Sequence, residues 1–154
     1  MSVYFLDASA LAKRYIEETG SAWVRGLCRP DDGHILLVAR ISRVEVASAF
    51  ARRQREGTLS QVEVDQTVDD LRIDFDTQYQ VVELSEELAE EAAWLVQRHP
   101  LRAYDAVQLA SALYLASALP ALSTPSFIFL SADARLLTVA KAEGVATDNP
   151  VNHP

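Results

Sequence analysis

The chain has 154 residues, of which 49% are hydrophobic, and carries a formal net charge of −8 with a pI of about 4.8. This length is enough for one domain with a proper core, and five Gly and six Pro are too few for low complexity or disorder. The negative charge excludes simple electrostatic binding of nucleic acid over the whole surface. A nucleic-acid enzyme of this composition would need metal ions and a local basic patch at its site.

The cysteine and histidine content argues against a disulfide-stabilised protein and against a zinc protein. Cys28 is the single cysteine, so no internal disulfide is possible, and this is compatible with the cytoplasm, where we expect the protein to act. The three histidines show no zinc-binding spacing. Asp7 interrupts the first apolar run too early for a signal peptide. Residues 106–132 contain no charge, but Pro120 and Pro125 break them, so we expect a buried helix, a turn and a buried strand, and no membrane segment.

Short apolar runs alternate with amphipathic segments along the whole chain. Apolar runs of this kind are typical of strands buried on both faces of a parallel sheet. We expect strands at residues 3–6, 35–39, 79–84 and 127–130, with a short last one at 145–146. We expect helices at residues 8–18, 21–28, 42–56, 61–74, 86–98, 103–119 and 134–143, with Ser60 and Ser85 as N-caps.

This alternation predicts βαβ units, and hence an α/β fold in which helices cover both faces of a mostly parallel sheet. No internal repeat or linker divides the chain, so residues 1–154 are expected to form one domain. Ligands of such sheets bind at the carboxyl ends of the strands.

Four acidic residues stand near these predicted ends. Asp7 and Asp133 fall at or just past the ends of apolar strands, and Glu45 and Asp105 lie in first helical turns that can face the same edge. Four carboxylates at one edge repel each other unless a cation neutralises them. Oxygen ligands without His or Cys favour Mg²⁺ or Mn²⁺ over Zn²⁺, so we expect these four residues to hold one or two such ions.

Each acid also has a purely structural explanation. Asp7 could cap the helix that follows it, and Ser42 with Glu45 fits a capping box. Asp105 and Asp133 stand where a negative charge favours the helix dipole. The shared edge of the sheet is what favours the functional interpretation.

Four segments resemble the motifs of PIN-domain proteins, in particular the VapC-like toxins. They are residues 5–15 (FLDASALAKRY), 43–47 (RVEVA), 104–110 (YDAVQLA) and 130–136 (LSADARL). The segments match in order and spacing, and the resemblance covers essentially the whole chain.

The resemblance implies a three-layer α/β/α sandwich and a Mg²⁺-dependent endoribonuclease. It also implies that Asp7, Glu45, Asp105 and Asp133 form the acidic site, that a small antitoxin blocks it, and that the protein is a homodimer. Ser9 and Ser131 match hydroxyl positions near the site that could orient water. Both also fit as plain turn or cap residues, and this simpler role is favoured for Ser9.

Arginines are the candidate phosphate contacts, although a solvated helix surface explains them equally well. The candidates are Arg40, Arg43, Arg52, Arg53, Arg55 and Arg102, with Arg43, Arg52 and Arg102 singled out for RNA. Asp148 is a spare acid for which the neighbouring Pro150 favours a turn role. Trp23 and Trp94 lie in amphipathic helices and are interpreted as core or interface residues.

Rival functions lack their signatures. A phosphoryl-transfer enzyme with a nucleophilic aspartate commonly shows Asp-x-Asp after the first strand, and here Ser9 is the third residue. A receiver domain needs a lysine after a late strand, where this chain has Ser131 and Thr147. A non-catalytic PIN-like binding module and an RNA-processing nuclease outside a toxin–antitoxin system remain as alternatives.

Overall fold

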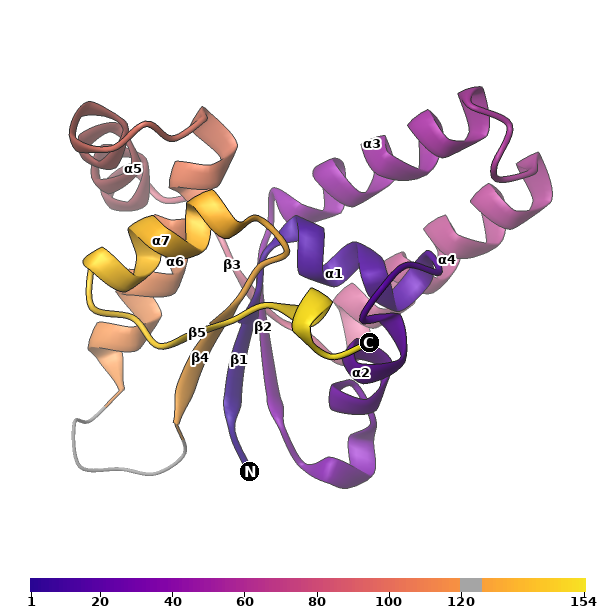
Figure 1. The fold of residues 1–154 in the computed structure, drawn as a ribbon, viewed down its shortest axis with the longest axis horizontal. Helices are drawn as coiled ribbons and strands as arrows, with labels where there is room; N and C mark the ends of the chain where they lie inside the picture. The colour runs from indigo at the N-terminus through magenta and orange to yellow at the C-terminus, as the bar shows by residue number, and fades with distance from the viewer. Residues whose placement is uncertain (120–125) are drawn as a thin grey trace.

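A five-stranded sheet forms the centre of the protein, as the computed structural model of residues 1–119 and 126–154 shows (Figure 1). The strand order is β3-β2-β1-β4-β5, and every pairing is parallel. The strands are β1 (Val3–Leu6), β2 (Ile35–Ala39), β3 (Gln80–Val82), β4 (Phe127–Leu130) and β5 (Thr147–Asp148). β1 is the central strand, because it pairs with β2 on one side and with β4 on the other. The strand order changes direction there, which makes the carboxyl end of β1 the expected place for a ligand.

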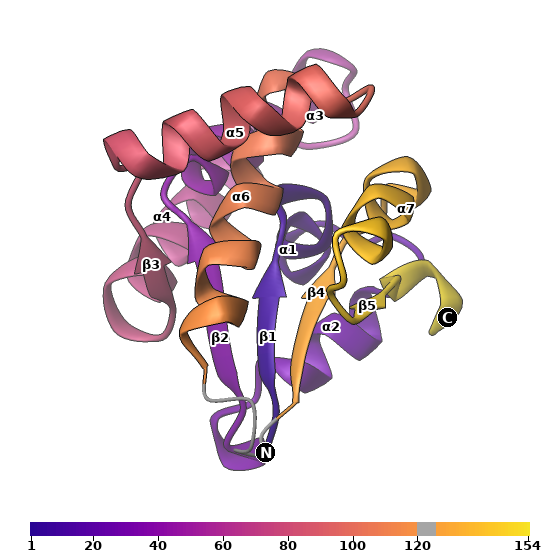
Figure 2. The same cartoon turned by 90° about the vertical axis from the view of Figure 1, so that its left-hand side faces the viewer.

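Helices cover both faces of the sheet, so the predicted three-layer α/β/α architecture is confirmed (Figure 2). One layer holds α1 (Ala8–Tyr15), α2 (Ser21–Leu27), α3 (Ser42–Arg55) and α4 (Gln61–Thr77). The other holds α5 (Glu86–Arg98), α6 (Ala103–Ala118) and α7 (Ala134–Ala142). Two single-turn helices, η1 (Pro30–Asp32) and η2 (Pro150–Asn152), complete the described elements.

Alternation along the strands divides the core between these two layers. Phe5 and Phe129 point to the α5–α7 side, whereas Leu6 and Leu130 pack against α1 to α4. Each face of a parallel sheet is therefore apolar, which explains the continuous hydrophobic runs in the sequence. The α3–α4 pair extends away from the sheet as an arm (Figure 1).

Some predicted boundaries were wrong by a few residues. The first helix ends at Tyr15 and not at Glu18, because Ile16 is extended, with φ −113° and ψ 131°. The fourth helix continues to Thr77, and the amide of Tyr79 still bonds to Asp74 O at 3.0 Å, so the third strand starts only after it.

The last strand lies two residues later than predicted, at Thr147–Asp148. Gly144 has a positive φ of 88°, and the amide of Val145 bonds to Ala140 O at 3.1 Å, so residues 144 and 145 still belong to the turn that ends α7. The predicted turn at Pro120 and Pro125 lies outside the described residues. No helix in the described part of the chain is long and apolar enough to cross a membrane.

Candidate active site

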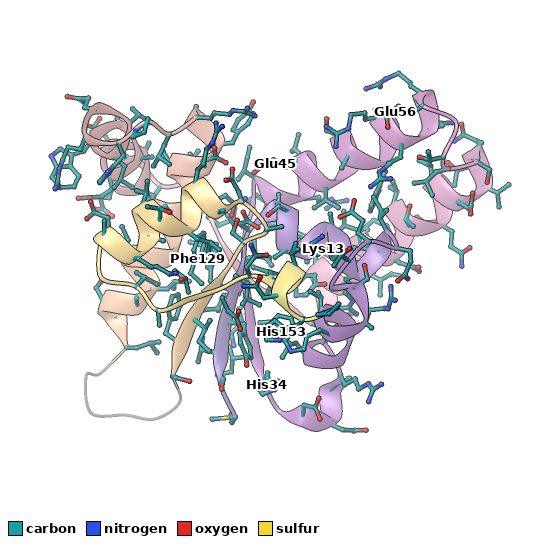
Figure 3. All side chains as sticks on the ribbon, viewed as in Figure 1. Lys13, His34, Glu45, Glu56, Phe129 and His153 are labelled. Carbon is teal, nitrogen blue, oxygen red and sulfur yellow. The ribbon has the colours of Figure 1, made fainter. Side chains whose placement is uncertain are left out.

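The acidic residues gather at the carboxyl edge of the sheet, as predicted. Asp7 follows β1 directly, and Asp133 comes three residues after the end of β4. Glu45 and Asp105 lie in the first turns of α3 and α6. Figure 3 labels Glu45 at this edge, where α3 begins above the sheet.

Asp7 is the buried centre of the site, with only 4% of its surface exposed. Its Oδ1 accepts hydrogen bonds from Ser9 Oγ at 2.7 Å and from the amide of Ala10 at 2.9 Å. Its Oδ2 accepts a bond of 2.6 Å from Ser131 Oγ. Asp7 therefore caps α1 and also faces the site, so the two interpretations of this residue are compatible.

Burial raises the pKa of Asp7 to about 6, against an ordinary value of 3.8. The hydroxyl of Ser131, the amide of Ala10 and the hydroxyl of Ser9 all lower this pKa, while the nearby charge of Asp105 raises it. Asp7 is thus a carboxylate whose negative charge the protein tolerates only with support from hydrogen-bond donors. A bound cation would supply further support.

Ser9 and Ser131 both support the site. For Ser9 this goes beyond the simple turn or cap role that was favoured from the sequence. Because each hydroxyl proton points at Asp7, each oxygen is left to accept a bond from the backbone. Ser9 Oγ accepts from the amide of Ala132 at 2.8 Å, and Ser131 Oγ accepts from the amide of Asp133 at 3.0 Å. The two hydroxyls tie the start of α1 to the loop between β4 and α7, which carries Asp133.

The capping-box explanation of Glu45 is wrong. The N-cap of α3 is Ile41, and Ser42 already lies inside the helix without a capping bond. Glu45 instead points at α6, where its Oε1 accepts a 2.8 Å hydrogen bond from Gln108 Nε2. Burial raises the pKa of Glu45, the Gln108 bond opposes this, and the charges of Asp7 and Asp105 raise the pKa further.

Asp105 and Asp133 complete the group of four acids. Burial and then the charge of Asp133 raise the pKa of Asp105, while the backbone amide and guanidinium of Arg102 lower it. Asp133 is the N-cap of α7 and accepts from the amides of Arg135 and Leu136 at 2.8 and 3.4 Å. Asp133 therefore has the capping contacts of its structural explanation, while its charge is still felt at Asp105.

The donor chemistry fits a divalent cation, although the side-chain positions do not yet form a complete shell. All four acids are hard oxygen ligands. The charge of Asp105 raises the pKa of Asp7, and the charges of Asp7 and Asp105 raise the pKa of Glu45, so positive charge among them would be favourable. In residues 1–119 and 126–154, no three carboxylates lie close enough to hold one ion as they stand. The carboxylates would have to turn toward a bound metal.

A groove of about 290 Å³ leads away from Glu45 between α1 and α3. Arg52 lines this groove and is exposed, on the same helix as Glu45. Arg43, Arg52 and Arg102 form no ion pair within 4 Å with any described acid. Arg40 and Arg53, in contrast, are paired with Glu83 and Glu18, which makes them weaker candidates for phosphate binding.

The remaining candidates have structural contacts. The carboxylate of Asp148 accepts from the amide of Asn149 at 2.7 Å and lies 2.9 Å from His153 Nε2, which is consistent with the turn role. Trp23 stacks on the His153 ring with centroids 3.9 Å apart. Trp94 is 46% exposed and lies under the guanidinium of Arg98, so of its two predicted roles the core role is wrong, and the interface role stays a prediction.

The PIN domain family matches residues 4–142, and the chain belongs to this family. Ribonuclease VapC49 of Mycobacterium tuberculosis is 34% identical over 144 residues, which cover 94% of this chain and 93% of that protein. The fold also resembles VapBC2 from Rickettsia felis bound to a DNA fragment from its promoter, with a TM-score of 0.64 and 9% identity over 96% of this chain and 98% of that one. A toxin–antitoxin complex from Klebsiella pneumoniae gives a TM-score of 0.60 with 15% identity over 97% and 98%.

Proposed function

We propose that this protein is a Mg²⁺-dependent endoribonuclease and the toxin of a toxin–antitoxin pair. The observation that carries the proposal is the buried Asp7 carboxylate, coupled by charge to Asp105 and Glu45 at the carboxyl edge of the sheet. The similarity to ribonuclease VapC49 over nearly the whole chain supports the reaction class.

The four acids would have two roles. Asp7, Asp105 and Asp133 would hold one or two Mg²⁺ ions, for which Mn²⁺ can substitute, and Glu45 would bind the second ion or orient the attacking water. A bound Mg²⁺ supplies the Lewis acidity that makes water a nucleophile at neutral pH and stabilises charge at the phosphate. No protein nucleophile is then required.

The other polar residues would prepare this site for RNA. Ser9 and Ser131 keep Asp7 in one orientation and favour its ionised form. Arg52, on the groove that starts at Glu45, and Arg43 and Arg102, near the starts of α3 and α6, would contact phosphates. Local cations of this kind are needed because the protein as a whole is acidic.

The partner would be a small antitoxin that inserts an arginine or lysine among the acids. Charge pairing in a site that excludes water is stronger than at an open surface, so a cationic side chain could replace the metal there. The fold shared with the Klebsiella pneumoniae toxin–antitoxin complex supports such a partner. We further expect a homodimer that acts on RNA in the cytoplasm.

The test is cleavage of total RNA by purified protein, with Mg²⁺, with Mn²⁺ and with a chelator. We expect cleavage with either metal and none in chelator, and Glu45→Gln and Asp105→Asn should both remove it. Undiminished cleavage in chelator would refute the metal mechanism. Metal binding without any RNA cleavage would favour the non-catalytic binding module, and cleavage without toxicity on expression would favour a processing nuclease.

A further inference from the structure

Gln108 connects the two helices that carry Glu45 and Asp105. The side chain lies on α6, three residues after Asp105, and only 1% of the residue is exposed. Its Nε2 donates two hydrogen bonds of 2.8 Å, one to Glu45 Oε1 and one to Ser42 Oγ, both on α3. Residues at i and i+3 share a helix face, so Gln108 and Asp105 approach the site together.

Chemistry fixes the orientation of this amide. An ionised carboxylate can only accept hydrogen bonds, so the NH₂ group and not the carbonyl of Gln108 must face Glu45. Both N–H groups are then used, and Gln108 Oε1 is left buried without a donor in the described residues. Gln108 thus donates hydrogen bonds to Glu45 and Ser42, while its own carbonyl oxygen remains without a donor.

This arrangement is unfavourable for folding alone. A buried carbonyl without a hydrogen bond lowers stability, and apolar side chains at both position 108 and position 42 would avoid that loss without leaving the buried Ser42 hydroxyl unpaired. Its α6 neighbours Ala106, Leu109 and Ala112 are apolar and fully buried. A glutamine here therefore needs an explanation other than core packing.

We propose that Gln108 is a positioning residue for the cleavage reaction, which holds the Glu45 carboxylate in register with Asp105. The proposal rests on the proposed function, because it acts through the role given to Glu45. Without the Gln108 bond, Glu45 is free to change rotamer, and the spacing between the acids on α3 and α6 is lost. The sequence could have flagged Gln108 only as a polar residue in a mostly apolar helix, three residues after Asp105.

The experiment compares Gln108→Met with the double variant Ser42→Ala/Gln108→Met. The double variant removes both ends of the Gln108–Ser42 hydrogen bond, so no buried Ser42 hydroxyl is left unpaired. Ser111→Ala is the matched control, since it removes another buried polar group of α6, one that donates only to Val107 O at 2.8 Å. Three quantities are measured: kcat and KM for RNA cleavage, the Mg²⁺ concentration that half-saturates thermal stabilisation, and Tm in chelator.

We expect both Gln108 variants to lose kcat by about 10- to 100-fold, the usual effect of removing a residue that orients a metal ligand, with little change in KM. They should also need several-fold more Mg²⁺ for stabilisation, while the double variant keeps or exceeds the wild-type Tm in chelator. Ser111→Ala should leave kcat and the Mg²⁺ requirement unchanged.

Wild-type kcat in the double variant would overturn the proposal, as would a loss of kcat that Ser111→Ala reproduces. If Glu45→Gln itself leaves cleavage intact, the role of Glu45 in the proposed function fails. If Glu45→Gln abolishes cleavage while the Gln108 variants remain fully active, only the role of Gln108 fails.

Discussion

Ser131 Oγ donates a 2.6 Å hydrogen bond to Asp7 Oδ2, although the two residues are 124 positions apart in the chain. The parallel pairing of β1 with β4 brings them together, because Leu6 stands opposite Leu130 in the register and each residue follows its strand. The hydroxyl is fully buried, so its partner cannot be replaced by bulk water. The ionisation of the central acid thus depends on the alignment of two strands.

Ser131→Ala should reduce cleavage most on the acid limb of the pH–rate profile, by about tenfold for each unit by which the pKa of Asp7 rises, and less at neutral pH, where part of Asp7 stays ionised. The Ser131 hydroxyl lowers the pKa of Asp7, so its removal raises that pKa and shifts the acid limb of the pH–rate profile to higher pH. The control is Ser117→Ala, whose exposed hydroxyl donates only to Tyr114 O. An unchanged acid limb in Ser131→Ala would contradict this role.

Asp105→Asn should raise the Tm of the metal-free protein while abolishing cleavage. Burial and the charge of Asp133 both disfavour the ionised form of Asp105, so neutralising it removes an unfavourable charge. A gain of about 1 kcal/mol corresponds to roughly 2–4 °C for a chain of this size. Thermal unfolding in chelator measures this gain.

The same two proteins should respond differently to millimolar Mg²⁺. Ligand binding to the folded state stabilises it by mass action, so the wild type should gain more than Asp105→Asn, which lacks one of the proposed metal ligands. If the mutant is less stable in chelator, and its Tm rises as much with Mg²⁺ as that of the wild type, Asp105 only stabilises the N-terminus of its helix.

The metal-free protein should become less stable as the pH rises from about 4 to 6. In this window unfolded chains release the Asp7 proton near 3.8, whereas the folded protein keeps it until a pH of about 6. The folded state binds more protons, so the free energy of unfolding falls with rising pH, by about 3 kcal/mol for a difference of two pH units.

Denaturant unfolding in chelator at pH 4.5 and pH 7 measures this loss. Asp7→Asn removes the titrating group, and with it the charge that raises the pKa of Glu45, so it should flatten the dependence. A wild-type dependence that Asp7→Asn leaves intact would show that Asp7 has an ordinary pKa in the folded protein.

Arg52→Ala should weaken RNA binding and reduce the slope of log K against log salt by about 1, as expected for one lost phosphate contact. Arg52 lines the groove next to Glu45 and has no ion-pair partner among the described acids. Arg72→Ala is the control, because Arg72 is exposed on α4 and lies near Asp69 instead. Equal losses for both variants would mean that RNA binding follows overall charge and not this groove.

The antitoxin complex should bind Mg²⁺ more weakly than the free toxin, because a cationic side chain among the acids would compete with the ion. Co-expression should also neutralise toxicity. Calorimetric titration of Mg²⁺ into the toxin and into the complex measures the difference. A complex that forms with unchanged Mg²⁺ affinity would show that the partner binds elsewhere.

Most of the fold was predictable because its signals are local. Buried parallel strands must be apolar throughout, so β1, β2 and β4 were located to the residue, and Ser85 and Ser60 marked helix starts through the amides that they cap. The misplaced ends, at Tyr15 and β5, depend on backbone hydrogen bonds that carry no residue signature.

The sequence by itself determined which residue types the site would contain and at which edge of the sheet they would stand. Strand ends and first helical turns are local features, and parallel strands place them at one edge. Only the tertiary structure decided what each side chain does there, because that depends on partners distant in the chain. Ser42 and Glu45 read locally as a capping box, yet both side chains bond to Gln108 across the helix interface. Ser9 was interpreted as a turn residue, and its bond to Asp7 is indeed local. Its oxygen also accepts from the amide of Ala132, 123 residues further along, because β1 and β4 are neighbours.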